Sequence, residues 1–256
     1  MYFEAKVATP GPMWGELRYS GELARLLAAG ALHPPRRRPE APPVLLVPGF
    51  MAGDASLSMM RHWLRRRGHR VSNSGMLVNM DCAERIVVRL EAQLEQASAH
   101  EGRPVVLIGQ SRGGALARAL AVRRPELVGA LVTLGSPVRD GLAVSAPVLR
   151  TVQWLARLGD LGLPGLFSSS CRDGDCCADF NEQLAAPLAP WIEAVAVYSR
   201  SDAIVDWRAC LDEHAEQIEV DSSHCGMSVH PAVYRLLDRL LDSAQERSRA
   251  TATLVG

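Results

Sequence analysis

Residues 105–114 read VVLIGQSRGG, and this stretch decides the fold of the chain. A run of β-branched and aliphatic residues ends at Gly109, Ser111 follows two residues later, and residues 115–121 are strong helix formers. Strand, sharp turn and helix in this order form a Gly-x-Ser-x-Gly elbow, which raises the serine above the end of a sheet. Gly109 and Gly113 let the backbones pass closely, and the next helix directs its N-terminal N–H groups at the serine. We therefore expect Ser111 to be a nucleophile.

Apolar runs alternate with helical patterns on both sides of the elbow. Strands are expected at residues 44–47, 105–110, 127–134, 194–198 and 217–220, with a weaker one at 69–73. Helices are expected at 56–67, 82–97 and 231–241, in addition to the helix after the elbow. Repeated strand–helix units with right-handed crossovers predict an α/β fold with a doubly wound, mostly parallel sheet. Ligands of such sheets bind at the carboxyl ends of the strands.

Three segments depart from this alternation. Residues 1–43 are expected to hold a short helix at 21–29 and a Pro- and Arg-rich linker at 33–43. Within the main domain, residues 44–242, the stretch 138–190 is too long for a simple connection and is interpreted as an inserted helical cap. The tail, 243–256, is expected to be frayed.

Composition excludes several classes of function. The chain has 256 residues, 48% of them hydrophobic, which suffices for one large α/β domain. Its 28 basic and 28 acidic residues balance, which argues against a nucleic-acid partner. No apolar run is long enough to span a membrane, and no signal peptide is visible at the N-terminus, so a cytoplasmic protein without membrane insertion is expected. Oligomeric state is left open.

A serine nucleophile needs a base and an acid, which in elbow proteins follow it in the order Ser, Asp/Glu, His. His224 lies in a loop of small residues just after a strand, whereas His230 begins the last helix. Asp202 lies directly after the strand at 194–198 and suits the acid, whereas Asp206 is more typical of a helix N-cap. We expect His224 to be the base and Asp202 the acid.

The loops around the elbow also offer groups that could bind a substrate. An oxyanion hole needs the N–H of the residue after the nucleophile, Arg112, and one from the loop after the first strand. Phe50 is the expected second donor, with Met51 as a close rival. Apolar residues of this loop and of the cap are candidates for the substrate-binding wall: Met51, Trp154, Leu155 and Phe167.

The motifs VPGF (47–50), GQSRGG (109–114), SRSDAIVDW (199–207) and SSHCGM (222–227) resemble those of α/β-hydrolases of the bacterial esterase/lipase type. The similarity covers residues 44–241 and, through the cap cysteines, extends to a subgroup of small hydrolases. It implies hydrolysis of a small ester through an acyl-enzyme, with Ser111, Asp202 and His224 as the reacting side chains. Acyl transfer to an alcohol and a non-catalytic binding protein are the alternatives. Pro48 replaces the histidine that many members carry before the oxyanion glycine.

Six cysteines are present, three of them in the motif CRDGDCC at residues 171–177. A structural zinc site usually uses two Cys-x2-Cys pairs, and no second pair exists here, so no metal is expected. Disulfides and free thiols both remain open, and a Cys210–Cys225 bond would tie the acid and base loops together. No cofactor is expected.

Overall fold

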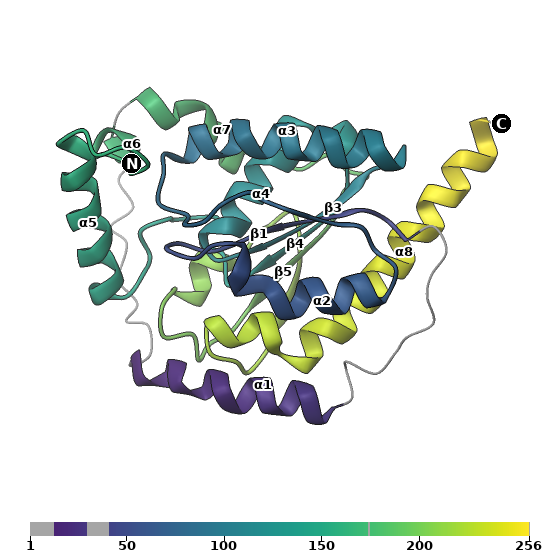
Figure 1. Cartoon of the computed structure of the whole chain (residues 1–256), viewed down its shortest axis with the longest axis horizontal. Coiled ribbons are helices and arrows are strands. Elements are labelled where there is room, and N and C mark those ends of the chain that lie inside the picture. Colours follow the sequence, from purple (N-terminus) through teal and green to yellow (C-terminus); the bar gives the residue numbers. More distant parts are fainter. Residues whose placement is uncertain (1–12, 30–40, 174, 256) are drawn as a thin grey trace.

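Six parallel strands form a central sheet in the order β2–β1–β3–β4–β5–β6 (Figure 1). The computed structural model describes residues 13–29, 41–173 and 175–255, so most of the linker expected at 33–43 lies outside the described residues. The strands are β1 Val44–Val47, β2 Val71–Asn73, β3 Val105–Gln110, β4 Val128–Leu134, β5 Glu193–Tyr198 and β6 Glu216–Glu219. This topology confirms the doubly wound, parallel sheet expected from the sequence.

The central strands are buried along their whole length. Every residue of β1 and of β3 is buried, because helices cover both faces of the sheet. Ile108 of β3 lies opposite Leu46 of β1 and Val132 of β4. The elbow therefore rises from the middle of the sheet, where its supporting strand is held on both sides.

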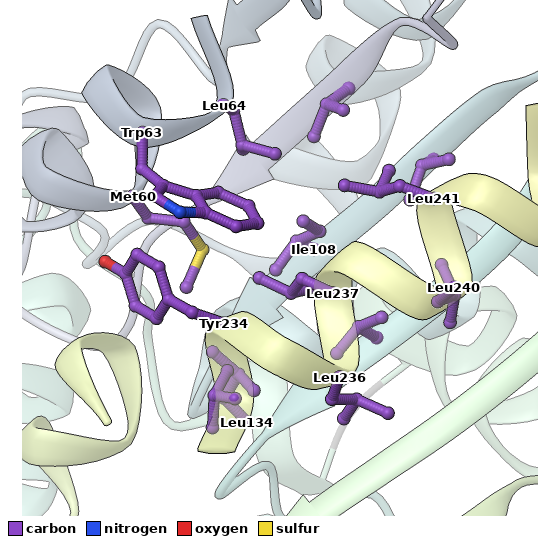
Figure 2. Close-up of a cluster of buried hydrophobic side chains, with 14 of the residues drawn as sticks. Met60, Trp63, Leu64, Ile108, Leu134, Tyr234, Leu236, Leu237, Leu240 and Leu241 are labelled. Carbon is purple, nitrogen blue, oxygen red and sulfur yellow. The ribbon is translucent and has the colours of Figure 1, made fainter. Parts of the chain in front are cut away.

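One face of the sheet is covered by α2 (Ser58–Arg66) and α8 (Pro231–Val255), with α1 (Tyr19–Ala28) outside them (Figure 1). Figure 2 shows the apolar side chains that meet there. The Trp63 and Tyr234 rings pack edge to face, with centroids 4.9 Å apart. Leu26 of α1 is fully buried in the same cluster, so α1 is part of the domain core.

The other face is covered by α3 (Ala83–Glu101), α4 (Arg112–Arg123) and α7 (Ala178–Ala185). Residues 113–121 of α4 are all buried, and their small side chains allow α4 to lie close to the strands. Arg118 of α4 forms an ion pair with Asp212 (2.6 Å) and also donates to the carbonyl of Leu184 (2.6 Å). Helix α7 and the β5–β6 connection are thereby fastened to α4.

The segment expected as a cap, residues 138–190, divides into two parts. Helix α5 (Ala146–Asp160) stands beside the sheet, away from the covering helices (Figure 1). Helix α6 (Ser170–Asp173) and the 3₁₀ turn η4 (Asp175–Cys177) lead back to α7, which packs against α3 and α4. Residues of both parts line the cavity described below.

The remaining regular elements are short 3₁₀ helices in the connections: η1 Met13–Arg18, η2 Asp54–Leu57, η3 Pro125–Leu127, η5 Trp207–Cys210 and η6 Cys225–Val229.

Residues 243–256 were expected to form a frayed tail; α8 continues through this region as far as Val255. Residues 243–255 contain no glycine or proline that would end a helix, and Ala244 is buried in the core cluster beside α2. The described part of the chain contains no helix with the length and apolar character needed to cross a membrane.

Candidate active site

Ser111 occupies a strained turn at the end of β3. Its φ is +53° and its ψ is −130°, a conformation that non-glycine residues rarely adopt and that is typical of functional sites. A Cβ at Gly113 would lie 2.3 Å from the carbonyl oxygen of Val47, so only glycine fits there. The Ser111 N–H donates to the carbonyl of Leu134 at the end of β4 (2.8 Å). The turn is thus fixed by its own strand and the two strands beside it.

His224 and Asp202 form a buried pair at the same end of the sheet. His224 Nδ1 lies 2.6 Å from Asp202 Oδ2, and the two residues are 4% and 3% exposed. Asp202 Oδ1 accepts the N–H groups of Ile204 and Val205, both at 2.8 Å, which fixes the carboxylate. Within the described residues, the other ring nitrogen, Nε2, has no hydrogen-bond partner. Gly135 gives the imidazole room, since a Cβ there would lie 3.1 Å from His224 Nδ1.

The surroundings of His224 raise its pKa. Burial on its own would lower the pKa, but the negative charge of Asp202, the hydrogen bond to Asp202 and the charge of Glu16 together raise it above the ordinary value. Burial lowers the pKa of the other candidate, His230. Asp206, the rival acid, caps η5 by accepting the N–H of Arg208 (3.0 Å). The two aspartates of this loop therefore have different partners.

Two backbone N–H groups face no acceptor at the elbow. Among the described residues, the N–H groups of Phe50 and Arg112 have no hydrogen-bond partner, whereas the Met51 N–H donates to the carbonyl of Asn79 (3.1 Å). A Cβ at Gly49 would lie 3.8 Å from Ser111 Oγ, so the loop after β1 approaches the serine closely. Phe50 and Arg112, rather than Met51, can therefore donate to an anion at this position.

A buried amide and a half-buried guanidinium hold the loop after β1 in place. Asn79, which is fully buried, donates to the carbonyl of Pro48 (2.8 Å) and accepts from the Arg112 guanidinium (2.5 Å). Arg112 also donates to the carbonyl of Asp81 (2.6 Å) and lies over the ring of Phe167, 5.6 Å from its centroid. Burial lowers the pKa of Arg112 to about 10, which still leaves it charged at neutral pH.

A cavity of about 1820 Å³ opens over the elbow, and both Ser111 and His224 line it. Among the described residues, no hydrogen bond joins these two side chains. In free enzymes the distance between a catalytic serine and its base is often long and shortens only when substrate binds. Of the four expected substrate-binding residues, Met51 and Phe167 line the cavity.

Trp154 and Leu155 do not line the cavity. Trp154 is 58% exposed and Leu155 is buried away from the cavity. Helix α5 instead presents a face at helical spacing, formed by Val148, Leu149, Val152 and Ala156. Trp154 lies nearly opposite this face because each successive residue turns by about 100°, whereas Leu155 is buried at the edge of the face, next to Val148.

Residues from distant parts of the sequence hold the loop of His224, residues 220–225, which we call the base loop. Glu22 of α1 is buried and accepts both the N–H (2.7 Å) and the hydroxyl (2.6 Å) of Ser223. Glu16 of η1 accepts the N–H groups of His224 (2.9 Å) and Cys225 (3.0 Å). Sequence reasoning missed both residues, because nothing in the sequence around Glu16 and Glu22 indicates that these segments contact the base loop.

The elbow also holds the base loop directly. Gln110, the residue before Ser111, donates from its side-chain amide to the carbonyl of His224 (3.2 Å). Ser199, at the end of β5, donates to the carbonyl of Ser222 (2.7 Å). Gln110 lies within the motif GQSRGG, and a polar residue at the end of an otherwise apolar strand was the signal that the sequence offered.

All six cysteines are free, so the Cys210–Cys225 bond considered above is not formed. One group of metal-ligating side chains stands out among the described residues, at the start of α3 against the cavity wall. The Sγ atoms of four cysteines there lie within 4.8 Å of one another. We call this group the cysteine cluster; its members are Cys82, Cys171, Cys176 and Cys177.

Solved structures of lipolytic enzymes have the same fold. A mature lipase of Bacillus licheniformis aligns with a TM-score of 0.59 at 15% identity, covering 80% of this chain and 94% of that one. A metagenome-derived lipolytic enzyme aligns with a TM-score of 0.57 at 16% identity, over 80% of this chain and 94% of that one. A monoacylglycerol lipase of Paleococcus ferrophilus aligns with a TM-score of 0.52 at 14% identity, over 79% of this chain and 96% of that one.

Neither a protein-family model nor a curated protein matches the sequence. The structural likeness nevertheless establishes that the chain has the α/β-hydrolase fold, as its motifs predicted.

Proposed function

We propose that this protein is a serine hydrolase that cleaves carboxylic esters. One observation carries the proposal: the 2.6 Å contact between His224 and Asp202 lies at the cavity that Ser111 enters from a strained elbow. A buried carboxylate that fixes an imidazole next to a serine is the arrangement that activates a serine for acyl transfer. The lipolytic enzymes that share the fold support the same class of reaction.

In the proposed reaction, Ser111 Oγ attacks the ester carbonyl while His224 Nε2 takes its proton. The charged imidazole is stabilised by Asp202. The N–H groups of Phe50 and Arg112 bind the oxyanion of the tetrahedral intermediate. His224 then protonates the departing alcohol, and in the second half it deprotonates the water that releases the acid.

The cavity supports an acyl or aromatic ester as the substrate. Its wall carries apolar side chains from the loop after β1 (Phe50), from α5 (Leu149 and Val152) and from the connection between α5 and α6 (Phe167). The Phe50 and Phe167 rings lie 6.1 Å apart and form one apolar surface beside the elbow. Apolar surface of this kind binds a hydrocarbon chain by removing it from water.

The test measures turnover of a chain-length series of p-nitrophenyl esters, together with labelling by a fluorophosphonate probe. We expect wild-type protein to hydrolyse these esters and to be labelled at Ser111. Ser111→Ala should lose labelling and nearly all turnover, by a factor of about 10⁶ as in subtilisin, and should keep its Tm within a few degrees.

Turnover near the wild-type level in Ser111→Ala would overturn the proposal. Folded wild-type protein that is neither labelled nor active would instead favour a binding protein. Adding an alcohol acceptor to the active enzyme separates hydrolysis from acyl transfer, since transfer yields a new ester in place of the free acid.

A further inference from the structure

We propose that the cysteine cluster binds a single zinc ion as four thiolates. The sequence argued against a metal because CRDGDCC lacks a second cysteine pair. The fold supplies the fourth ligand from elsewhere, because Cys82 at the start of α3 meets the segment that joins α6 to α7.

The spacing of the sulfur atoms fits one tetrahedral ion. Four sulfurs bound to zinc at about 2.3 Å would lie about 3.8 Å from one another. The Sγ of Cys82 lies 3.4 Å from that of Cys177, and the Sγ of Cys176 lies 3.5 Å from that of Cys171 and 3.9 Å from that of Cys177. The ligand set consists of soft sulfur atoms alone, which favours zinc over magnesium or calcium.

The same distances are too long for disulfide bonds. A disulfide joins its sulfurs at about 2.05 Å, whereas the shortest separation in the cluster is the 3.4 Å between Cys82 and Cys177. Each of these two sulfurs also has other cluster members as neighbours. The arrangement is therefore that of a shared centre.

The charges around the cluster complement a zinc tetrathiolate, which carries a formal charge of −2. The guanidinium groups of Arg85 and Arg112 both interact electrostatically with cluster cysteines. Among the described residues Arg112 forms no ion pair with a carboxylate, and its hydrogen bonds go to neutral oxygens. Arg112 is half-buried at the cavity wall, and an anionic centre beside it would be stabilised by its positive charge.

Two helix ends also favour thiolates here. Cys82 is the N-cap residue of α3, and Cys177 is the N-cap residue of α7. The positive end of a helix dipole stabilises a thiolate at this position.

Four protein ligands leave no open position, so the ion would be structural rather than catalytic. It would fasten the segment before α7 to the start of α3. Cys171 and Cys177 also line the cavity, so the ion would fix one part of its wall.

The test determines the metal content of the full chain, purified without chelator from zinc-supplemented cells, by inductively coupled plasma mass spectrometry. We expect close to one zinc ion per chain in the wild type. Cys82→Ser and Cys176→Ser should lose most of it, whereas the control Cys225→Ser, which removes an exposed thiol outside the cluster, should keep it. The chelator 1,10-phenanthroline should lower the Tm of the wild type and leave that of Cys176→Ser unchanged.

Wild-type protein that contains no zinc while its thiols all react with Ellman's reagent would overturn the proposal. Iron in place of zinc would overturn it too, as would a native mass that shows hydrogen loss through disulfide bonds. These readouts decide the question even if the serine variants fail to fold, and none of them depends on ester turnover.

Discussion

The elbow and the base loop lie side by side, yet they are held in different ways. The elbow is fixed by its own glycines and by the strands on either side of β3. The base loop is fixed by carboxylates from η1 and α1, by an amide from the elbow and by a hydroxyl from β5. The position of Ser111 therefore depends on neighbouring sequence, whereas that of His224 depends on residues from the whole length of the chain.

Among changes that leave the elbow intact, the largest expected effect comes from removing the carboxylate that orients His224. Asp202→Asn should reduce kcat/KM for a p-nitrophenyl ester by about 10⁴, because the amide favours the wrong imidazole tautomer. Asp206→Asn is the matched control, since Asp206 only caps η5, and it should cost about 1 kcal/mol of stability. A larger loss of activity in Asp206→Asn would assign the acid to that residue.

Adding a single methyl group at Gly113 of the elbow should destabilise the protein. In Gly113→Ala the new Cβ would lie 2.3 Å from the Val47 carbonyl oxygen, and neither backbone can move aside. We expect the free energy of unfolding in urea to fall by about 3 kcal/mol or more. Gly21→Ala is the control: its Cβ meets nothing within 4 Å, and alanine in a helix should stabilise the protein by about 0.5–1 kcal/mol. Equal stability of the two variants would contradict the close packing of the elbow.

The base loop should respond to a distant residue of α1. Glu22→Ala leaves the buried N–H and hydroxyl of Ser223 without their acceptor, which should cost about 1–3 kcal/mol in urea unfolding. If Glu22 positions the loop, kcat should fall while KM changes little, and Glu22→Gln should restore part of the loss. Loss of stability with unchanged kcat would leave Glu22 a purely structural role.

The smallest effect is a shift in pH dependence. Because the base must be neutral and the pKa of His224 is raised, the acid limb of kcat/KM should lie above the ordinary histidine value. Glu16→Gln removes one of the charges that raise this pKa, so the limb should move to lower pH. Glu126→Gln, on the exposed surface, should leave it in place. A limb that moves upward in Glu16→Gln would contradict the assignment of His224 as the base.

The sequence predicted the fold and the local parts of the candidate site because their signals lie within short stretches. The strand, glycines and helix around Ser111 are contiguous, and chain order together with position just after a strand led to Asp202 and His224, which lie in contact. Contacts between segments that are distant in the sequence could not be predicted. Nothing near Glu22 indicates Ser223, and nothing near Cys82 indicates the cysteines of CRDGDCC.

The segment expected as a cap illustrates a second limit on what the sequence can predict. Its apolar composition predicted that it packs, but composition does not reveal which face of α5 turns inward. Trp154 is the largest apolar residue of that helix and yet points outward. The contrast with the elbow is physical: a tight turn leaves one conformation, whereas an amphipathic helix can be rotated about its axis by a neighbour.

The contact between α1 and the base loop has a consequence for synthesis on the ribosome. Glu22 and Ser223 are 201 residues apart, and Glu16 and His224 are 208 apart. A growing chain contains the elbow and its flanking strands once β4 has emerged, long before residue 223 is translated. During that interval the nucleophile of the proposed enzyme exists without its base. An unfinished chain would therefore carry an inert serine, and activity would begin only when the last part of the protein closes onto the first.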